Sequence, residues 1–178
     1  MTRPLLRFAA LGCVALFFAA CDRSEPPAES STAAIPIPFG TRISFSQAGD
    51  SARYKVSGWS KAEEKFTWSE GTSAQLKIPI TPTEDPIILK MSVAALINPP
   101  ALPFQPVEVY VNDQKIADWQ VGNTAEFTAP LPAAVTKLGG VLNFTFKTPK
   151  ATSPKALGQS ADERVLGICC LDLELAKR

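Results

Sequence analysis

Five stretches of the chain alternate apolar and polar residues with a period of two. They are residues 74–80, 87–93, 107–111, 142–146 and 169–175. In each stretch one face is apolar and the other is polar, as in β-sheets that bury one face and expose the other to water. The pattern therefore predicts an antiparallel β fold.

Turn-forming residues separate these stretches. Prolines break the pattern at residues 81–86 and 98–100, glycines break it at 139–140, and Asn112-Asp113 predicts a tight hairpin. The one helical candidate is the short segment 132–138. Short strands with frequent turns are typical of β-sandwiches. We therefore expect an all-β chain that forms a single antiparallel, jelly-roll-like β-sandwich of about eight to ten strands.

The beginning of the chain has a different pattern. A short basic head, residues 3–7, precedes an apolar run over residues 8–18, and Ala19-Ala20-Cys21 follows. This is the three-part arrangement of a secretory signal peptide, and its end resembles a bacterial lipobox, in which the cysteine is acylated. The alternative is an ordinary signal peptide that is cleaved before a cysteine. We expect lipidation of Cys21, because it is the only cysteine that follows an Ala-Ala pair. A diacylglycerol with an N-acyl chain is sufficient for stable anchoring.

The segment after Cys21 is predicted to be a tether. Pro, Ala, Ser and Glu dominate residues 22–38 without a periodic apolar face, which indicates a semi-rigid segment with no fold of its own. The predicted organisation is a signal peptide over 1–20, a lipidated cysteine and tether over 21–40, and a β-sandwich over 41–178. We expect the domain on the periplasmic side of a bacterial envelope membrane. Asp22 resembles the residue that retains lipoproteins at the inner membrane.

The composition restricts the chemistry. The chain has 18 Lys and Arg against 17 Asp and Glu, so no basic excess points to nucleic acid. It has no histidine, which excludes Ser-His-Asp and Cys-His nucleophiles and removes the commonest nitrogen ligand of zinc. Glu84 and Asp85 are candidate calcium ligands, but no Asp-x-Asp-x-Asp-Gly run accompanies them. We expect no metal, no cofactor and no nucleic-acid partner.

Two adjacent cysteines, Cys169 and Cys170, lie in the last alternating stretch. Neighbouring strand residues point to opposite faces, so a disulfide between these two cysteines is geometrically unfavourable. The alternation places Cys169 on the apolar face with Leu171, Leu173 and Leu175. We therefore expect one cysteine to be buried and the other to face outward.

Residues 58–71, GWSKAEEKFTWSEG, contain Trp59 and Trp68 on either side of Glu63 and Glu64. Indoles offer flat apolar faces to sugar rings, and carboxylates hydrogen-bond sugar hydroxyls. The alternative is structural, with both tryptophans closing an open end of the sandwich core. Glu63 and Glu64 do not suit glycoside hydrolysis, because such enzymes hold two carboxyls about 5–10 Å apart across a cleft. We therefore expect no enzymatic activity.

An ordered set of motifs resembles a β-sandwich module of bacterial surface-polysaccharide proteins. The motifs are Gly58-Trp59 with an acid a few residues on, Trp68-x-x-Gly71, Val109-Tyr110-Val111-Asn112, and the segment 153–167, SPKALGQSADERVLG. The resemblance covers most of the domain, about residues 43–176. Such modules occur beside glycosyltransferases and membrane proteins of glycan assembly, and they look like jelly-roll carbohydrate-binding folds. This chain departs from the pattern in Asp113, where the module usually has glycine, and in lacking a transferase domain.

The resemblance implies a lipid-anchored accessory or glycan-binding module of polysaccharide assembly, whose partner is an envelope glycan or an assembly protein. It also implies that Asp162 and Arg164 meet the segment 58–64 in space. Arg164 would then pair with Asp162 and with Glu63 or Glu64, either as part of a ligand site or as a structural lock. The alternative function is a purely structural or protein-docking envelope lipoprotein that binds no sugar.

Overall fold

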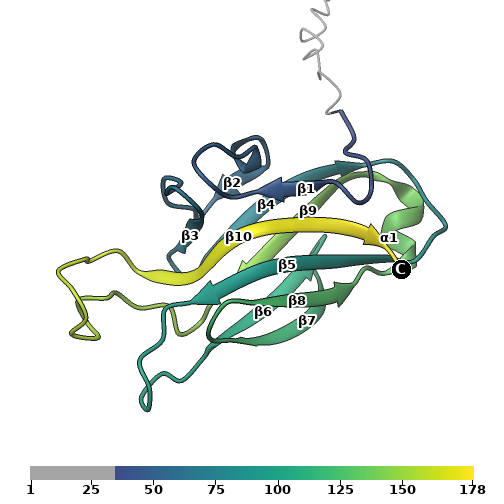
Figure 1. Ribbon diagram of the computed structural model, residues 1–178. Coiled ribbons are helices and arrows are strands. Elements are labelled where there is room, and N and C mark those ends of the chain that lie inside the picture. The colour runs from purple at the N-terminus through teal and green to yellow at the C-terminus, as the bar shows by residue number, and fades with distance from the viewer. Residues whose placement is uncertain (1–34) are drawn as a thin grey trace, which may run out of the picture. The chain divides into compact units, whose positions relative to one another are not determined.

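The computed structural model describes residues 35–178 of the chain. This part is an antiparallel β-sandwich of ten strands with one α-helix and one 3₁₀-helix (Figure 1). The prediction of an all-β, two-sheet sandwich is confirmed. The predicted signal peptide, the lipidation site Cys21 and most of the predicted tether lie outside the described residues. Within residues 35–178, no helix is long and apolar enough to cross a membrane.

Ten antiparallel strands form two five-stranded sheets. The first sheet has the order β1-β10-β5-β8, with β3 also paired to β10. Its strands are β1 (Arg42–Ser44), β3 (Thr67–Glu70), β5 (Ile87–Ala95), β8 (Ala125–Pro130) and β10 (Leu166–Lys177). The second sheet has the order β2-β4-β9-β6-β7. Its strands are β2 (Lys55–Ser57), β4 (Ser73–Ile80), β6 (Gln105–Val111), β7 (Gln114–Val121) and β9 (Gly140–Lys147).

The helical pieces are short. They are the 3₁₀-helix η1 (Ser51–Arg53) and the helix α1 (Ala133–Leu138), which occupies the predicted helical segment. The predicted hairpin joins β6 to β7, and Asn112 and Asp113 have φ values of 46° and 64°. Positive φ at both central residues is the requirement of the two-residue turn that matches the twist of a hairpin.

The core lies between the two sheets. The apolar positions of the alternating runs point into it, and the largest fully buried side chains include Phe45, Phe144 and Phe146. Trp119 from β7 is also buried, and its indole nitrogen donates to the carbonyl oxygen of Thr128 at 3.1 Å. The polar positions of the same runs consequently form the outer faces of the sandwich.

A β-bulge changes the predicted orientation of the last strand. Cys170 pairs with Val93 and Asp172 pairs with Ser92, so Leu171 is an extra residue in β10. A bulge of this kind reverses the alternation of the strand. Cys170 therefore points into the core together with Leu173 and Leu175, and the predicted inward position of Cys169 is wrong.

Cys169 is nevertheless buried, with 6% of its surface exposed. Its backbone neighbours across the sheet are Trp68 on β3 and Ala94 on β5. Cys169 therefore faces away from the core, as expected for one of the two cysteines, but it is not exposed, so the expectation that only one of them is buried is wrong. Both thiols are free, and burial raises the pKa of Cys169 to about 12.

Residues 35–40 are part of the folded unit, whereas the sequence pattern assigns them to the tether. The backbone nitrogen of Ile37 donates to the carbonyl oxygen of Pro79 at 2.9 Å, and that of Gly40 donates to Leu175 at 2.8 Å. The side chain of Ile37 is buried in the core cluster. An isolated apolar residue among prolines has no periodic pattern, so its burial depends on contacts with distant strands.

Candidate functional site

The outer face of the second sheet carries a continuous set of polar side chains. Cross-strand pairing aligns one residue from each of its five strands in a row, which reads Ser57, Gln75, Thr145, Tyr110 and Lys115 from β2 to β7. Directly paired residues of antiparallel strands have their side chains on the same face. Every side chain in this row can donate or accept a hydrogen bond.

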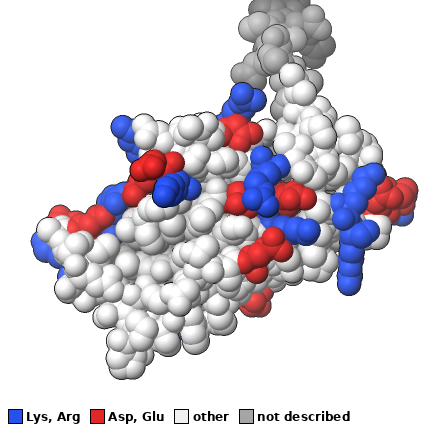
Figure 2. All heavy atoms as spheres, in the orientation of Figure 1, with Lys and Arg blue, Asp and Glu red and all other residues white. Residues whose placement is uncertain are grey.

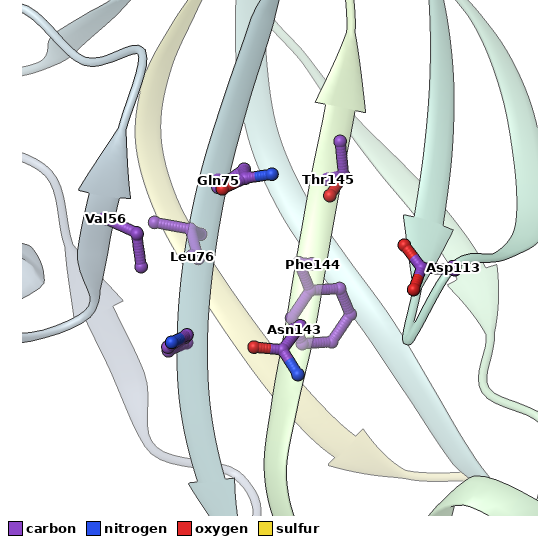
Figure 3. Close-up of a pocket in the computed structure, with 8 residues that line it drawn as sticks. Val56, Gln75, Leu76, Asp113, Asn143, Phe144 and Thr145 are labelled. Carbon is purple, nitrogen blue, oxygen red and sulfur yellow. The ribbon is translucent and has the colours of Figure 1, made fainter.

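A polar hollow lies in this face, between β2 and the β6–β7 turn. Its volume is about 230 Å³, and the residues that line it are Val56, Gln75, Leu76, Lys77, Asp113, Asn143, Phe144 and Thr145. Gln75 and Thr145 lie on adjacent strands, and Asp113 lies beyond β9 at the turn (Figure 3). The hollow therefore combines amides, a hydroxyl, an ammonium group and a carboxylate.

The backbone around the hollow is held by further hydrogen bonds. The side-chain oxygen of Asn112 accepts from the backbone nitrogen of Asn143 at 2.9 Å, which ties the hairpin turn to β9. The hydroxyl of Ser57 donates to the side-chain oxygen of Gln75 at 3.2 Å. These contacts orient the amides before any ligand arrives, which lowers the entropic cost of binding.

Charged groups surround Tyr110 on the same face. Its hydroxyl donates to Glu108 at 2.8 Å, and this bond lowers the pKa of Glu108 and raises that of Tyr110. Lys115 Nζ lies 3.5 Å from Glu108 and 2.6 Å from Asp118. Lys147 Nζ lies over the tyrosine ring, 4.6 Å from its centroid. The hydrogen bond of the hydroxyl to Glu108 and the contact of Lys147 with the ring face together orient the side chain of Tyr110.

Three of the residues selected from sequence meet at a separate corner of the molecule, between the loop before β10 and the loop before β3. Arg164 Nε donates to both carboxylate oxygens of Asp162, at 3.1 and 3.0 Å, and Arg164 Nη2 donates to Asp162 at 2.6 Å. Arg164 Nη2 also lies 3.9 Å from Glu63 Oε1. The arginine bond lowers the pKa of Asp162. The structure therefore brings Arg164, Asp162 and Glu63 together.

Glu64 does not join this corner. It is exposed, and it takes part in none of the side-chain hydrogen bonds or ion pairs found within residues 35–178. The arginine itself is 40% exposed, so its ion pairs are accessible to water and salt. The predicted pairing is present, but it is not the buried lock that would make its loss very costly.

The two tryptophans of the segment have different environments. Trp59 is half-buried and packs on the core, with ring centroids 5.2 Å from Phe45 and 6.4 Å from Phe146. Its indole nitrogen donates to the backbone oxygen of Gln75 at 2.8 Å. Trp68 is half-buried and meets Phe66 edge-on, at 6.1 Å. Trp59 therefore supports β4 from the side, and it does not present a free stacking surface.

The site selected from sequence did not include the residues of the polar hollow. Gln75, Asn143 and Thr145 occupy the polar positions of two alternating runs, so the pattern identifies them only as outward-facing. One feature of the sequence could have identified them. Amide and hydroxyl side chains occur in the alternating runs 74–80 and 142–146, and these runs are neighbours in the sheet. The pairing of β4 with β9 joins residues about 70 positions apart, and no local pattern specifies that pairing.

Carboxylates and basic side chains also lie outside this face, among residues 35–178. Within residues 35–178, no three His, Cys, Asp or Glu residues form a group that could hold a metal ion. Glu84 and Asp85 form ion pairs with Lys137 and Lys177. On the side of the molecule shown in Figure 2, basic and acidic side chains are interspersed and form no patch of a single sign.

Comparisons with known proteins show similarity of fold. No protein-family model and no curated protein matches the chain. The CBM36-1 domain of a multidomain xylanase from the hindgut metagenome of Trinervitermes trinervoides is 9% identical, with a TM-score of 0.43 over 78% of this chain and 97% of that one. The C-terminal CBM6 of LamC, a marine laminarinase from Zobellia galactanivorans, is 10% identical, with a TM-score of 0.44 over 77% and 98%. A carbohydrate-binding module CBM36 in complex with calcium and xylotriose is 7% identical, with a TM-score of 0.45 over 76% and 99%. Similarity at this level concerns the arrangement of the strands alone.

Proposed function

We propose that this protein is a lipid-anchored, non-catalytic module of a bacterial cell envelope that binds a glycan on the outer face of its second sheet. In this role it serves as an accessory in polysaccharide assembly. The observation that carries the proposal is the row of hydrogen-bonding side chains that crosses all five strands beside the polar hollow.

The size and chemistry of the polar hollow suit a single sugar residue. Its volume of about 230 Å³ is below the range of about 300–1,000 Å³ that is usual for drug-sized ligands. A sugar ring presents several hydroxyls, each of which both donates and accepts. The amides of Gln75 and Asn143 and the hydroxyl of Thr145 also offer both functions, and they project from paired strands.

The same hollow is unsuited to hydrolysis. Asp113 is the one carboxylate among its lining residues, whereas glycoside hydrolysis uses a pair of carboxyls on either side of the bond. Glu63 is engaged with Arg164, and neither Glu63 nor Glu64 lines the hollow. Binding without turnover is therefore the function that these groups support.

The anchor in this proposal comes from the sequence. Acylation of Cys21 would hold Ile35 within about 50 Å of the bilayer, the length of the intervening segment when fully extended. We expect a fatty-acid analogue supplied to growing cells to label the protein, and Cys21→Ala to abolish the label. Continued labelling of that variant would contradict the anchor without affecting the binding face.

Glycan binding is tested with residues 22–178, which include the compact unit Ala33–Arg178 and carry no lipid. Titration calorimetry with soluble fragments of envelope polysaccharides measures the affinity. Thr145→Val removes one hydroxyl from the polar hollow, and we expect it to weaken binding about threefold to tenfold, the range of one hydrogen bond. Thr128→Val, on the exposed outer side of β8 in the other sheet, is the matched control and should leave the affinity unchanged.

Two results would redirect the assignment. If Arg164→Ala abolished glycan binding while Thr145→Val did not, the ligand site would be the corner formed by Arg164, Asp162 and Glu63. If no envelope glycan bound at all, the structural or protein-docking function would replace the proposal.

A further inference from the structure

A second hollow lies on the same sheet, and it is mainly apolar. This apolar groove has a volume of about 590 Å³ and is lined by residues 35–38, Arg53, Tyr54, Lys77, Pro79 and Val141, among others. Ile35 is 87% exposed and Val141 is 43% exposed. Side chains of this type gain free energy when an apolar partner removes them from water.

The apolar groove is continuous with the polar hollow. Lys77 lines both. Pro79 and Val141 are cross-strand partners on β4 and β9, two residues along the same strands from Lys77 and Asn143. The outer surface of these two strands therefore changes along its length from polar to apolar. Lys77 lies where this surface changes from polar to apolar.

Positive charge is available where the two halves meet. Lys77 and Arg53 form none of the ion pairs found within the described part of the chain. The nearby carboxylate of Asp50 also lines the apolar groove, and its Oδ1 accepts a hydrogen bond from the backbone nitrogen of Ser44 at 3.0 Å. An anionic group placed at the junction would meet two basic side chains.

Resting on the proposed function, we propose that the ligand is a lipid-linked glycan, in which a phosphate joins a saccharide to a long hydrocarbon chain. The saccharide occupies the polar hollow, the phosphate lies at Lys77 and Arg53, and the hydrocarbon chain lies along Ile35 and Val141. A soluble polysaccharide would leave the apolar half of this surface without a partner. A plain fatty chain would leave the amides and hydroxyls of the polar half unused.

The position of the apolar groove along the chain favours the same ligand. Ile35 lines it, and the chain leads from Ile35 back to Cys21, the predicted point of acylation. Under the proposed anchor the groove stays within the reach of the bilayer surface. When the tether lets the domain approach the bilayer, a hydrocarbon chain can pass from the bilayer into the groove over a short distance.

The experiment uses residues 22–178 and three probes: decyl phosphate below its micellar concentration, inorganic phosphate, and decyl maltoside. Dissociation constants are measured by chemical-shift titration. We expect decyl phosphate to bind at least about tenfold more tightly than inorganic phosphate, because the chain adds apolar contact. Binding of decyl maltoside should be less sensitive to Lys77→Gln than binding of decyl phosphate, because decyl maltoside lacks the charge that Lys77 and Arg53 complement.

Two variants and two matched controls locate the site. Lys77→Gln should weaken the binding of decyl phosphate about tenfold. Lys150→Gln, in the exposed loop after β9, should leave this binding unchanged. Val141→Asn should weaken the binding of decyl phosphate and leave the binding of inorganic phosphate unchanged. Val165→Asn, at a position that is 40% exposed, should change the binding of neither probe. All four positions are exposed, so the variants are expected to fold.

Four results would overturn the proposal. Equal binding of decyl phosphate and inorganic phosphate would show that the apolar groove holds no chain. Concentration-dependent self-association that Val141→Asn abolishes, seen by sedimentation, would assign the groove to a second copy of this protein. Binding of decyl phosphate at Lys77 without binding of any glycan would make this a lipid phosphate site and would also remove the proposed function. A glycan that binds through Thr145, with no effect of Lys77→Gln or Val141→Asn on decyl phosphate, would overturn this inference alone.

Discussion

Gly58→Ala is expected to destabilise the sandwich through a backbone contact that no side-chain movement can relieve. Gly58 has a φ of +72°, and a Cβ atom at this position would lie 2.0 Å from the carbonyl oxygen of Ser73 and 2.8 Å from the Cα atom of Ala74. Both atoms belong to the backbone of the first two residues of β4. The carbonyl oxygen of Gly58 also accepts from the backbone nitrogen of Glu70 at 2.8 Å, so the segment is held on two sides.

The expected loss has two parts. A left-handed backbone costs an ordinary residue about 1–2 kcal/mol, and forcing an extra carbon into a packed site costs about 1–3 kcal/mol more. Gly71 provides a matched control, because its φ is +82° and a Cβ there would have no atom within 4 Å. Gly71→Ala therefore carries only the first part, and the difference between the two variants isolates the contact with β4.

The assay is thermal and urea unfolding of residues 22–178, followed by circular dichroism. We expect Gly58→Ala to be less stable than Gly71→Ala by about 1–3 kcal/mol, or about 3–10 °C in Tm for a domain of this size. Trp59 follows Gly58 and donates to Gln75, so its fluorescence should also change in Gly58→Ala. If the two variants unfold within about 0.5 kcal/mol of each other, the close approach of Gly58 to β4 does not limit stability and the reasoning fails.

Three further predictions concern Arg164, Cys169 and Tyr110. Arg164→Ala should lower stability by only about 1 kcal/mol, because its ion pairs are half-exposed; a loss above about 3 kcal/mol in urea unfolding would indicate a buried lock instead. Cys169, with its pKa raised to about 12 by burial, should not react with a disulfide reagent at about pH 8 until the protein is unfolded; rapid labelling of the native protein would contradict this. Tyr110→Phe removes the bond that lowers the pKa of Glu108, and a lowered carboxyl pKa contributes stability that is lost as the pH falls through it. The difference in Tm between Tyr110→Phe and the parent protein should therefore shrink below about pH 4, and a constant difference from neutral to acid pH would refute it.

The register of the strands explains why the fold was predictable and most of the site was not. The alternating runs, the Asn112-Asp113 turn and the helix at residues 133–138 depend on backbone geometry within a few residues. Arg164 and Asp162 are two positions apart, so their pairing is also a local property of an extended chain. The approach of Glu63 to Arg164 was implied by the motifs of a resembled family, and no local pattern contains it.

Tertiary structure decides the features that join distant segments. The bulge at Leu171 exchanges the faces of Cys169 and Cys170, and it lies where the neighbour of β10 opposite β5 changes from β3 to β1. The row across the second sheet aligns Gln75 and Thr145 because β4 pairs with β9 in one register, and a slip of one residue would turn the side chains of a strand to the opposite face. Local sequence determines which residues of an unbroken strand face water, since that depends on the period of the strand, whereas the bulge at Leu171 reverses it. Which of those residues meet in a binding surface depends on pairing between strands, and the packing of the whole core selects that pairing.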